Sequence, residues 1–385
     1  MHPQPAESGR LHGLDALRAA AMLLGVVLHA ALFYLTIEVG DGLPRDRAQH
    51  PAFNLLVFTI HLFRMPVFFL MAGYFCALLV DKRGWRAMAA NRVRRVLAPL
   101  LLFWPVVLGG LWAAYAWTFH TLQQPFRQIP FGRLGDPFSE RMLFHLWFLY
   151  HLLLFYAAAM LLRKAPGGPA IAGWALPRLA WMLRSFWGFF LLTALTAIPL
   201  LESQVGIVET SGSLTPPVWI LAVYWLCFAC GWAIFREGGV LAGWRTRWAA
   251  YASVFALLPL HLNVLLTPGR GGEWRSLILA VLGAAMLWGA TIAVTGAFLR
   301  YVDARRAWAR ALSDASYWIY LVHLPLVAAA ANVMRPFALP AALKFLTVTG
   351  SVFVITFLTY DLFVRNTFLG VLLNGRRYPR LIAWK

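Results

Sequence analysis

Long apolar stretches alternate with short polar ones along most of the chain. Ten of the apolar stretches are long enough, or nearly long enough, to cross a bilayer about 30 Å thick as helices. They lie near residues 14–37, 53–80, 96–117, 143–162, 185–201, 217–235, 248–266, 276–299, 315–334 and 345–364. The pattern predicts an all-α, polytopic membrane protein with about ten transmembrane helices, built as a single domain over residues 1–385.

The composition agrees with this fold class. Of the 385 residues, 61% are hydrophobic and 13% are charged, whereas a soluble domain is nearer half apolar and a quarter charged. A disordered chain is therefore excluded, and an ordinary soluble globule is disfavoured. The three cysteines lie in apolar segments, so no disulfide framework is expected, and the Cys227-x-x-Cys230 pair is interpreted as packing.

The net charge of +19 has an explanation in membrane topology. The termini and the loops after even-numbered segments carry 23 Lys and Arg, and the opposite loops carry 9. Because basic residues concentrate on the cytoplasmic side, both termini are predicted to be cytoplasmic. The same bias identifies the lipid bilayer as a partner and argues against nucleic acid. The longest outer loop, 118–142, could cover an external site.

The first apolar segment carries ionisable side chains on one face. Arg18 and His29 are eleven positions apart, which is about three helical turns or roughly 16 Å, and Asp15 lies one turn before Arg18. Ionisable groups inside a span are costly and usually face the bundle interior. A snorkelling arginine and a hydrogen-bonded core histidine are the structural alternative. The pattern favours function, with Asp15, Arg18 and His29 as candidate catalytic residues.

The second segment places His61 and Arg64 on neighbouring surface positions, near the middle of the bilayer. A central arginine costs about 2.5 to 3.5 kcal/mol on insertion scales. Arg64 therefore needs a carboxylate, carbonyl groups or an anionic substrate, and a structural ion pair is an equal alternative. Asp361 lies toward the cytoplasmic end of the last segment, which is deeper than such a partner should be.

Two later segments add polar aromatic side chains at related depths. They are Trp147 and His151 in the fourth segment and Tyr320 and His323 in the ninth. With His29 and His61, these imidazoles could line one substrate-binding cavity. A metal site is the alternative, but no His-x-x-x-His pair or carboxylate cluster supports one, so no metal is predicted. Tyr and Trp near span ends are also typical interface anchors.

The stretch 81–95 is strongly basic and includes Arg92, Arg94 and Arg95. The positive-inside rule alone predicts a basic cytoplasmic loop here. The functional interpretation is a clamp for the phosphates of an anionic cofactor.

These residues together resemble the integral-membrane acyltransferase-3 family. Arg18 and His29 match that family's Arg-(ten residues)-His motif, and Arg92 and Arg95 match its Arg-x-x-Arg motif. Residues 316–323, Ser-Tyr-Trp-Ile-Tyr-Leu-Val-His, resemble its late Ser-Tyr…Tyr-Leu-x-His segment. Since ten spans also match its membrane domain, the resemblance covers nearly the whole chain.

Within that family, two stretches are similar to the glucan biosynthesis protein C group. They are His-Leu-Phe-Arg-Met-Pro at 61–66 and His-Leu-Trp-Phe-Leu at 145–149. That group is associated with succinylation of osmoregulated periplasmic glucans. The resemblance implies a membrane O-acyltransferase of the bacterial cytoplasmic (inner) membrane, moving an acyl group from cytoplasmic acyl-CoA to a hydroxyl of an extracytoplasmic glycan.

The resemblance also implies roles for the candidate residues. Acyl-CoA, either succinyl-CoA or acetyl-CoA, would be the donor substrate, and no cofactor would be bound permanently. Its head would rest on Arg92, Arg95 and Arg18, and its arm would reach His29 as general base. An acyl-histidine intermediate is a less favoured alternative. The acceptor and the oligomeric state, a homo-oligomer included, stay open.

Two further roles complete the expectation. Tyr320 and His323 are candidate oxyanion stabilisers. A free carboxylate on a succinyl group would need a cation when buried, and Arg64 would supply it.

A transporter or exporter of an anionic or polysaccharide substrate is the competing class. Such a protein usually has paired repeats with matching broken helices. The prolines of the apolar segments do not pair into halves, so this class stands second. A non-catalytic assembly or sensor protein stands third, because the Arg18 and His29 motif is intact.

Overall fold

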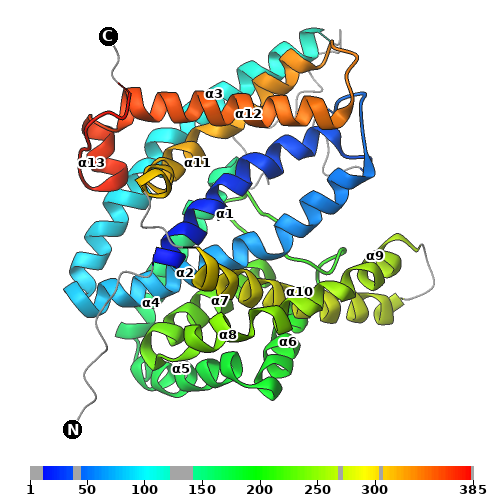
Figure 1. Ribbon diagram of the computed structural model, residues 1–385. Coiled ribbons are helices and arrows are strands. Elements are labelled where there is room, and N and C mark those ends of the chain that lie inside the picture. The colour runs from blue at the N-terminus through cyan, green and yellow to red at the C-terminus, as the bar shows by residue number, and fades with distance from the viewer. Residues whose placement is uncertain (1–11, 38–44, 122–141, 268–271, 303–306, 383–385) are drawn as a thin grey trace.

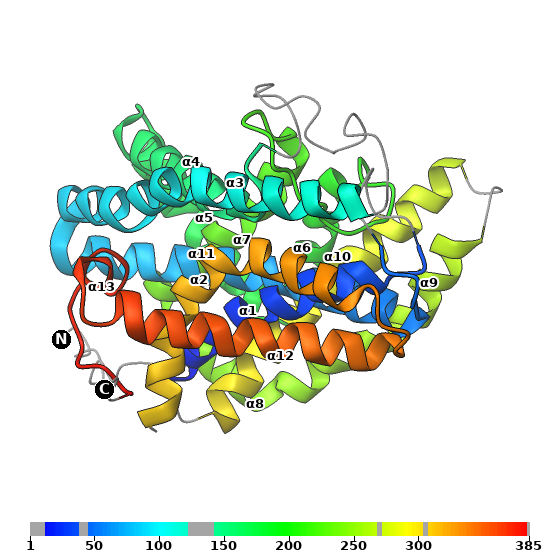
Figure 2. The same ribbon diagram turned by 90° about the horizontal axis from the view of Figure 1, so that it is seen from above.

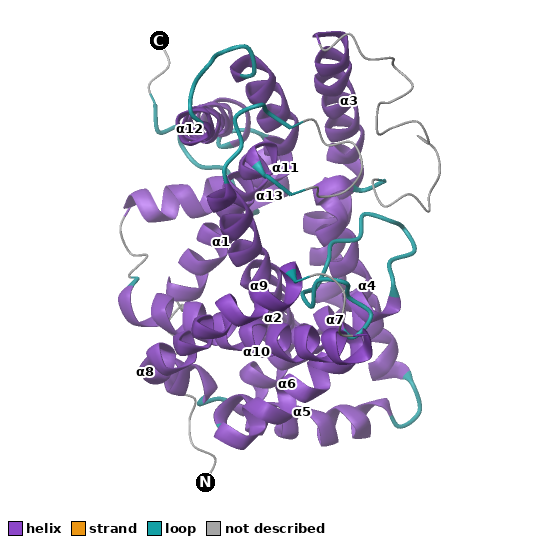
Figure 3. Ribbon diagram, turned by 90° about the vertical axis from the view of Figure 1, so that its right-hand side faces the viewer, coloured by secondary structure: helices purple, strands orange, loops and turns teal. Residues whose placement is uncertain are grey.

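The computed structural model describes residues 12–37, 45–121, 142–267, 272–302 and 307–382 (Figure 1). Within these ranges the chain is helical and contains no strand (Figure 3). The α-helices are α1 (His12–Ala31), α2 (Pro51–Arg92), α3 (Ala98–Thr121), α4 (Trp147–Lys164), α5 (Gly168–Arg184), α6 (Phe186–Leu200), α7 (Val218–Glu237), α8 (Val240–Ala252), α9 (Leu258–Leu266), α10 (Gly272–Tyr301), α11 (Ala307–Met334), α12 (Ala341–Thr359) and α13 (Phe368–Asn374). Shorter helical turns are η1 (Leu32–Tyr34), η2 (Val93–Leu97), η4 (Phe144–Leu146), η5 (Ser253–Leu257) and η6 (Tyr360–Val364).

In the described chain, eight helical stretches are long and apolar enough to cross a membrane, or nine if the bent pair α5 and α6 forms one span. One of the eight, Pro51–Thr118, is 68 residues long and contains both predicted segments 53–80 and 96–117. Figure 2 shows α3 returning in the direction opposite to α2. The all-α, multi-pass prediction is confirmed, with eight or nine candidates where ten segments were expected.

The basic stretch 81–95 is not the loop that its composition predicted. α2 continues to Arg92 and η2 follows directly, with one non-helical residue at Gly84 (φ 77°, ψ 170°). Glycine reaches this backbone conformation without steric cost, so the chain bends there and resumes the helix. The residues after it, Ala-Met-Ala-Ala at 87–90, are strong helix formers.

The stretch 163–184 also differs from its predicted loop. Residues 168–184 form α5, which meets α6 at an angle of 115°. Ser185 makes the corner, because its hydroxyl accepts a hydrogen bond from the Gly188 amide at 2.8 Å and so caps α6. Each helix alone is too short for a full span. Hydropathy detected only α6, because α5 is the less apolar of the two helices.

The bundle is layered, as Figures 1 and 3 agree. α3, α11 and α12 lie on one side of α1, and α5, α6 and α8 lie on the other, with α2, α7 and α10 between. Helices α2 and α7 approach closely because each has a glycine at the contact. A side chain on Gly73 would collide with the Phe228 carbonyl, and one on Gly231 with the Leu70 carbonyl. Small residues commonly permit such approaches in membranes.

The start of α1 and helix α13 lie toward the same end of the bundle (Figure 2). The cytoplasmic location of that end stays a prediction from the charge bias. The predicted outer loop 118–142 falls mostly outside the described residues.

Candidate active site

Three histidines from distant parts of the sequence meet in the bundle interior. His29 near the end of α1, His145 of η4 and His323 of α11 form this group, which we call the histidine cluster. The ring centroids of His29 and His323 are 5.1 Å apart, and those of His145 and His323 are 4.8 Å apart. His29 and His145 are 6.2 Å apart. Three helices must pack correctly to bring these rings together.

The protonation of His323 can be read from its neighbours. Its Nδ1 lies 2.7 Å from the Tyr320 carbonyl oxygen and 3.2 Å from that of Ile319. Because a carbonyl oxygen only accepts, Nδ1 must carry the hydrogen. The other nitrogen, Nε2, is then a lone-pair acceptor in the neutral ring. Nε2 is buried and has no partner within the described part of the chain.

His145 is held by its backbone. The Tyr320 hydroxyl donates to the His145 carbonyl oxygen at 2.8 Å. The preceding residue, Phe144, has a left-handed φ of 45°, a conformation that costs energy for a bulky side chain. Neither ring nitrogen of His145 has a well-aligned hydrogen-bond partner among the described residues. The surrounding structure therefore imposes an unfavourable local conformation to place this ring.

Arg64 of α2 points into the same region. Its Nη1 packs so close to α1 that a methyl group on Gly25 would lie 2.6 Å from it and 3.8 Å from His323 Nε2. Arg64 is 9% exposed, and its hydrogen bond from Nη2 to the Met65 sulfur, at 3.6 Å, is a weak one. Within the described residues its Nε is unpaired and no carboxylate lies within ion-pair distance.

Asp361, which the sequence places too deep to pair with Arg64, makes its contacts elsewhere. It lies 3.9 Å from Arg365, and its two carboxylate oxygens accept hydrogen bonds from the amides of Leu381 and Ile382 at 2.7 and 3.2 Å. Asp361 thus fastens Leu381 and Ile382 to η6, and it does not serve Arg64.

The histidine side chains of this region differ in their solvent exposure. His145 and His323 are buried, whereas His29 is partly exposed. His61, one turn before Arg64, is also partly exposed and lies within electrostatic range of His29. A reacting group must be reachable by its substrate, so His29 is the member of the histidine cluster suited to direct contact.

The predicted residues His151 and Trp147 lie in a separate aromatic enclosure. His151 is 0% exposed, and its ring centroid is 4.9 Å from that of Trp147 and 6.4 Å from those of Phe69 and Tyr224. Both of its ring nitrogens are unpaired in the described structure. The structure does not bring His151 into ring contact with the histidine cluster.

The other end of α1 meets the predicted phosphate clamp. Arg95 lies within electrostatic range of Arg92, Arg18 and Arg83, so four cations gather there. The Tyr317 hydroxyl donates to the Arg95 carbonyl at 2.7 Å. This bond joins the late Ser-Tyr segment to the Arg-x-x-Arg stretch.

The individual arginines differ. Arg92 and Arg95 are partly buried, and the Arg92 guanidinium lies 4.7 Å from the Tyr156 ring centre. Arg94, by contrast, is exposed. Arg18 and Asp15 approach at 3.8 Å, with side chains 41% and 19% exposed. A surface pair of this kind contributes little stability.

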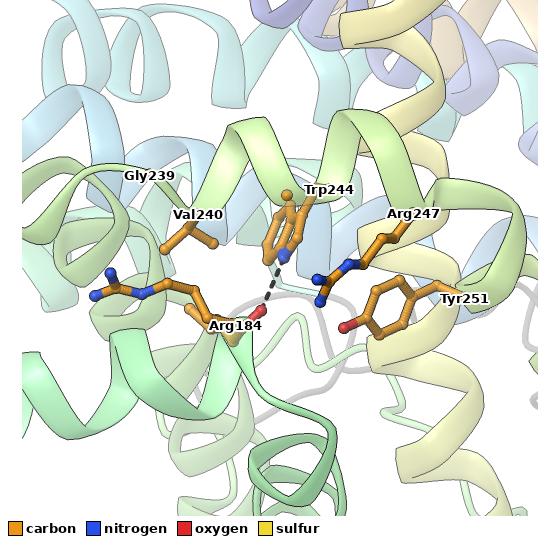
Figure 4. A pocket seen from close by; sticks show the side chains of 8 residues that line it. Arg184, Gly239, Val240, Trp244, Arg247 and Tyr251 are labelled. Atoms are coloured by element: carbon orange, nitrogen blue, oxygen red, sulfur yellow. Dashed lines mark hydrogen bonds between the residues drawn. The ribbon is translucent and has the colours of Figure 1, made fainter.

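No group of three ligating side chains in the described residues is arranged to hold a metal ion. A pocket of about 190 Å³ lies elsewhere, between the α5–α6 corner and α8 (Figure 4). Arg184, Arg247 and Tyr251 line it, and the Trp244 indole donates to the Leu183 carbonyl at its floor. None of the histidine cluster lines this pocket.

His145 was not among the residues singled out for the site. The signal was present, since His145 opens the His-Leu-Trp-Phe-Leu stretch. Only the return of η4 against α11 shows that it belongs with His29 and His323.

Comparisons with known proteins identify the family of the chain. The family model described as "Acyltransferase domain" matches residues 11–361. The chain is 26% identical over 396 residues to the glucans biosynthesis protein C of Salmonella paratyphi A, covering 97% of this chain and 96% of that protein. Proteins of the same name from Salmonella agona and Salmonella enteritidis match equally. No solved structure matches the chain.

Proposed function

Because the chain belongs to the acyltransferase-3 domain family, we propose that it moves an acyl group from cytoplasmic acyl-CoA to a hydroxyl of a glycan outside the bacterial inner membrane. One observation carries the proposal. A single helix, α1, places Arg18 among the arginines and His29 in the histidine cluster. The two sites are about 16 Å apart along the helix, as expected for a donor with a charged head and a long arm.

The arginine group would hold the head of the donor. Arg92 and Arg95 are partly buried and Arg18 lies beside them. Guanidinium groups bind phosphate oxygens through paired hydrogen bonds, and several cations are needed for a polyphosphate. The exposed Arg94 would contribute attraction at a distance rather than contact.

His29 would act as general base in the transfer. It takes the proton of the acceptor hydroxyl while that oxygen attacks the thioester carbonyl carbon. A carbon–oxygen bond forms, the carbon–sulfur bond breaks, and the imidazolium returns its proton to the departing CoA thiolate. The products are an ester and free CoA.

Arg64 would select the acyl group. Its guanidinium is buried without a carboxylate among the described residues, and a succinyl group carries a free carboxylate that fits this need. The name of the Salmonella relatives, glucans biosynthesis protein C, supports a glucan as acceptor. Succinyl transfer to glucan is therefore our first choice, with acetyl transfer as the alternative.

Mass spectrometry of glycans tests the proposal. Periplasmic glucans and surface polysaccharides are compared between cells that carry the wild-type protein and cells that carry His29→Ala. We expect an ester-labile mass increment with wild type only, whose mass names the acyl group. If no glycan differs while a glycan accumulates inside the cells, the protein is an exporter and the proposal is wrong.

A further inference from the structure

We infer that His323 positions His29 for catalysis: the Nε2 lone pair of His323 accepts the N–H of the His29 ring and so directs the opposite nitrogen of His29 toward the acceptor hydroxyl. The catalytic part of this inference rests on the proposed function. The hydrogen bond itself is inferred independently, from the unpaired Nε2 of His323 and the separation of 5.1 Å between the two ring centroids.

The tautomer of His323 makes it an acceptor. Its Nδ1–H is used on the Tyr320 carbonyl at 2.7 Å, with the Ile319 carbonyl at 3.2 Å. The buried Nε2 has no partner in the described chain. A buried polar atom left unpaired costs free energy comparable to a lost hydrogen bond. This cost indicates that Nε2 of His323 accepts a hydrogen bond from a donor in the working protein.

His29 is at the right distance to be that donor. A hydrogen bond of about 2.9 Å between two ring nitrogens, each about 1.1 Å from its ring centre, puts the ring centres about 5 Å apart. The observed separation is 5.1 Å, with an angle of 50° between the rings. Rotation of the His29 ring about χ2 aligns the two groups, and this torsion has broad preferences in histidine.

A base of this kind needs an orienting acceptor. In many hydrolases a carboxylate holds the imidazole in one tautomer. No carboxylate interacts with His29 among the described residues, where its charged and titratable neighbours are His323, Arg64, His145 and His61. His323 is the neighbour with a fixed, unprotonated nitrogen. It therefore takes the place of the carboxylate.

The consequences for proton movement are specific. When His29 accepts the hydroxyl proton on its outward nitrogen, its inward N–H stays donated to His323 Nε2. The neutral acceptor then stabilises the positive charge on His29 against repulsion by the nearby Arg64 guanidinium. When the proton passes to the CoA thiolate, the pair returns to its starting state.

His145 is the competitor for the same lone pair. Its ring centroid is 4.8 Å from that of His323, nearer than that of His29. His145 is 5% exposed, however, and its backbone is fixed by Tyr320. A bond from His145 would leave His29 without an orienting group. The experiment must therefore distinguish the two donors.

Two substitutions of His323 separate positioning from structure. Asparagine mimics the Nδ1 side of histidine and can keep the bond to the Tyr320 carbonyl, but it lacks an acceptor at the Nε2 position. Glutamine places its amide oxygen near the Nε2 position but does not reproduce the carbonyl bond. The assay uses inverted inner-membrane vesicles loaded with periplasmic glucan, and it follows labelled succinyl-CoA and acetyl-CoA into the glucan.

The positioning role predicts that His323→Asn lowers kcat at least tenfold with an unchanged KM for the donor, and that His323→Gln retains more activity than His323→Asn. A purely structural role predicts that His323→Asn retains more activity than His323→Gln, and that His323→Asn is also the more thermally stable variant. That reverse order would overturn the inference.

A spectroscopic arm works without turnover. Solid-state ¹⁵N NMR spectra are recorded on histidine-labelled protein in bilayers. The resonance of the unprotonated Nε2 of His323 is assigned as the one that is present in wild type and missing in His323→Gln. We expect this resonance to shift in His29→Ala and to stay in place in His145→Phe. A shift in His145→Phe alone would refute the inference. Wild type inactive in the vesicle assay, with the His29 shift present, would refute the proposed function and leave the hydrogen bond standing.

Discussion

Two buried cations, Lys344 and Arg64, have opposite surroundings. Lys344 Nζ lies 2.8 and 2.9 Å from the two oxygens of Asp46 and 3.3 Å from the Arg335 carbonyl. Asp46 also accepts from the Ala48 amide at 2.9 Å. This ion pair joins the segment before α2 to the first turn of α12 and to the turn that precedes it.

Arg64 is nearly as buried, yet the described chain offers it a sulfur atom and neutral rings in place of a carboxylate. Burying an unpaired charge costs several kcal/mol. Lys344, which is paired with Asp46, stabilises the fold. Arg64 has no such partner in the described chain and lies near the partly exposed His29, which is the arrangement that we propose for binding a charged substrate. The comparison predicts separate effects on stability and activity.

The largest effect is expected at the unpaired region. His29→Ala should lower acyl transfer about 10²- to 10⁴-fold, the usual contribution of a general base. Its thermal unfolding should stay within a few degrees of wild type, since His29 is partly exposed. Transfer assays and thermal scans of the same preparation measure both. Undiminished transfer would remove His29 from the mechanism.

The paired region should respond in the opposite sense. Lys344→Met leaves Asp46 buried without its cation and should destabilise the protein by about 3 to 5 kcal/mol. The double variant Asp46→Asn/Lys344→Met should recover most of this loss. Activity per folded molecule should hardly change. Unfolding in denaturant measures the stability, and an unchanged midpoint in Lys344→Met would contradict the comparison.

The variant Arg64→Gln tests whether the unpaired cation binds the carboxylate of a succinyl donor. Loss of a charged hydrogen bond worth about 1.5 to 3 kcal/mol predicts a 10- to 100-fold fall in succinyl transfer. Acetyl transfer should fall much less, and stability should not fall. Rates with succinyl-CoA and acetyl-CoA are compared in parallel. Equal loss with both donors would make Arg64 structural, like Lys344.

At the arginine group the expected effect is smaller. Arg95→Ala should raise the donor KM about tenfold with little change in kcat, since it removes phosphate contacts far from the reacting atoms. Arg94→Ala is the matched control, because this exposed neighbour should raise KM less than Arg95→Ala. The same response from both variants would indicate general attraction rather than a clamp.

The smallest effect is expected in the aromatic enclosure. His151→Phe replaces an unpaired, fully enclosed ring by one of similar size, so transfer should change less than about twofold. If His151 lines the acceptor path, as the sequence suggested, the acceptor KM should rise clearly instead. Acceptor titrations distinguish the two results.

The local pattern of the sequence was enough to predict much of the fold. The all-α class and most membrane segments followed from apolar length, because a chain in lipid must satisfy its backbone within helices. Hydropathy failed at α5 and at the stretch 81–95. Short or basic helices depend on caps and neighbours, such as the Ser185 corner, and apolar length does not report these.

For the site, the sequence by itself determined which side chains could not lie in lipid: Arg18, His29, Arg64 and His323 are costly there wherever the helices pack. It also determined that Arg18 and His29 share a face, since that follows from helical period alone. The sequence did not determine which side chains from other helices lie next to these residues.

Only the tertiary structure decided how these residues combine. It brought His145 to His29 and His323, enclosed His151 apart from them, and gave Asp361 to Arg365 rather than to Arg64. Each outcome depends on which helix faces join over long sequence separations. A periodic pattern fixes the face of a helix and leaves its partner open. The fixed tautomer of His323 and the unpaired charge of Arg64 are therefore properties of the folded bundle.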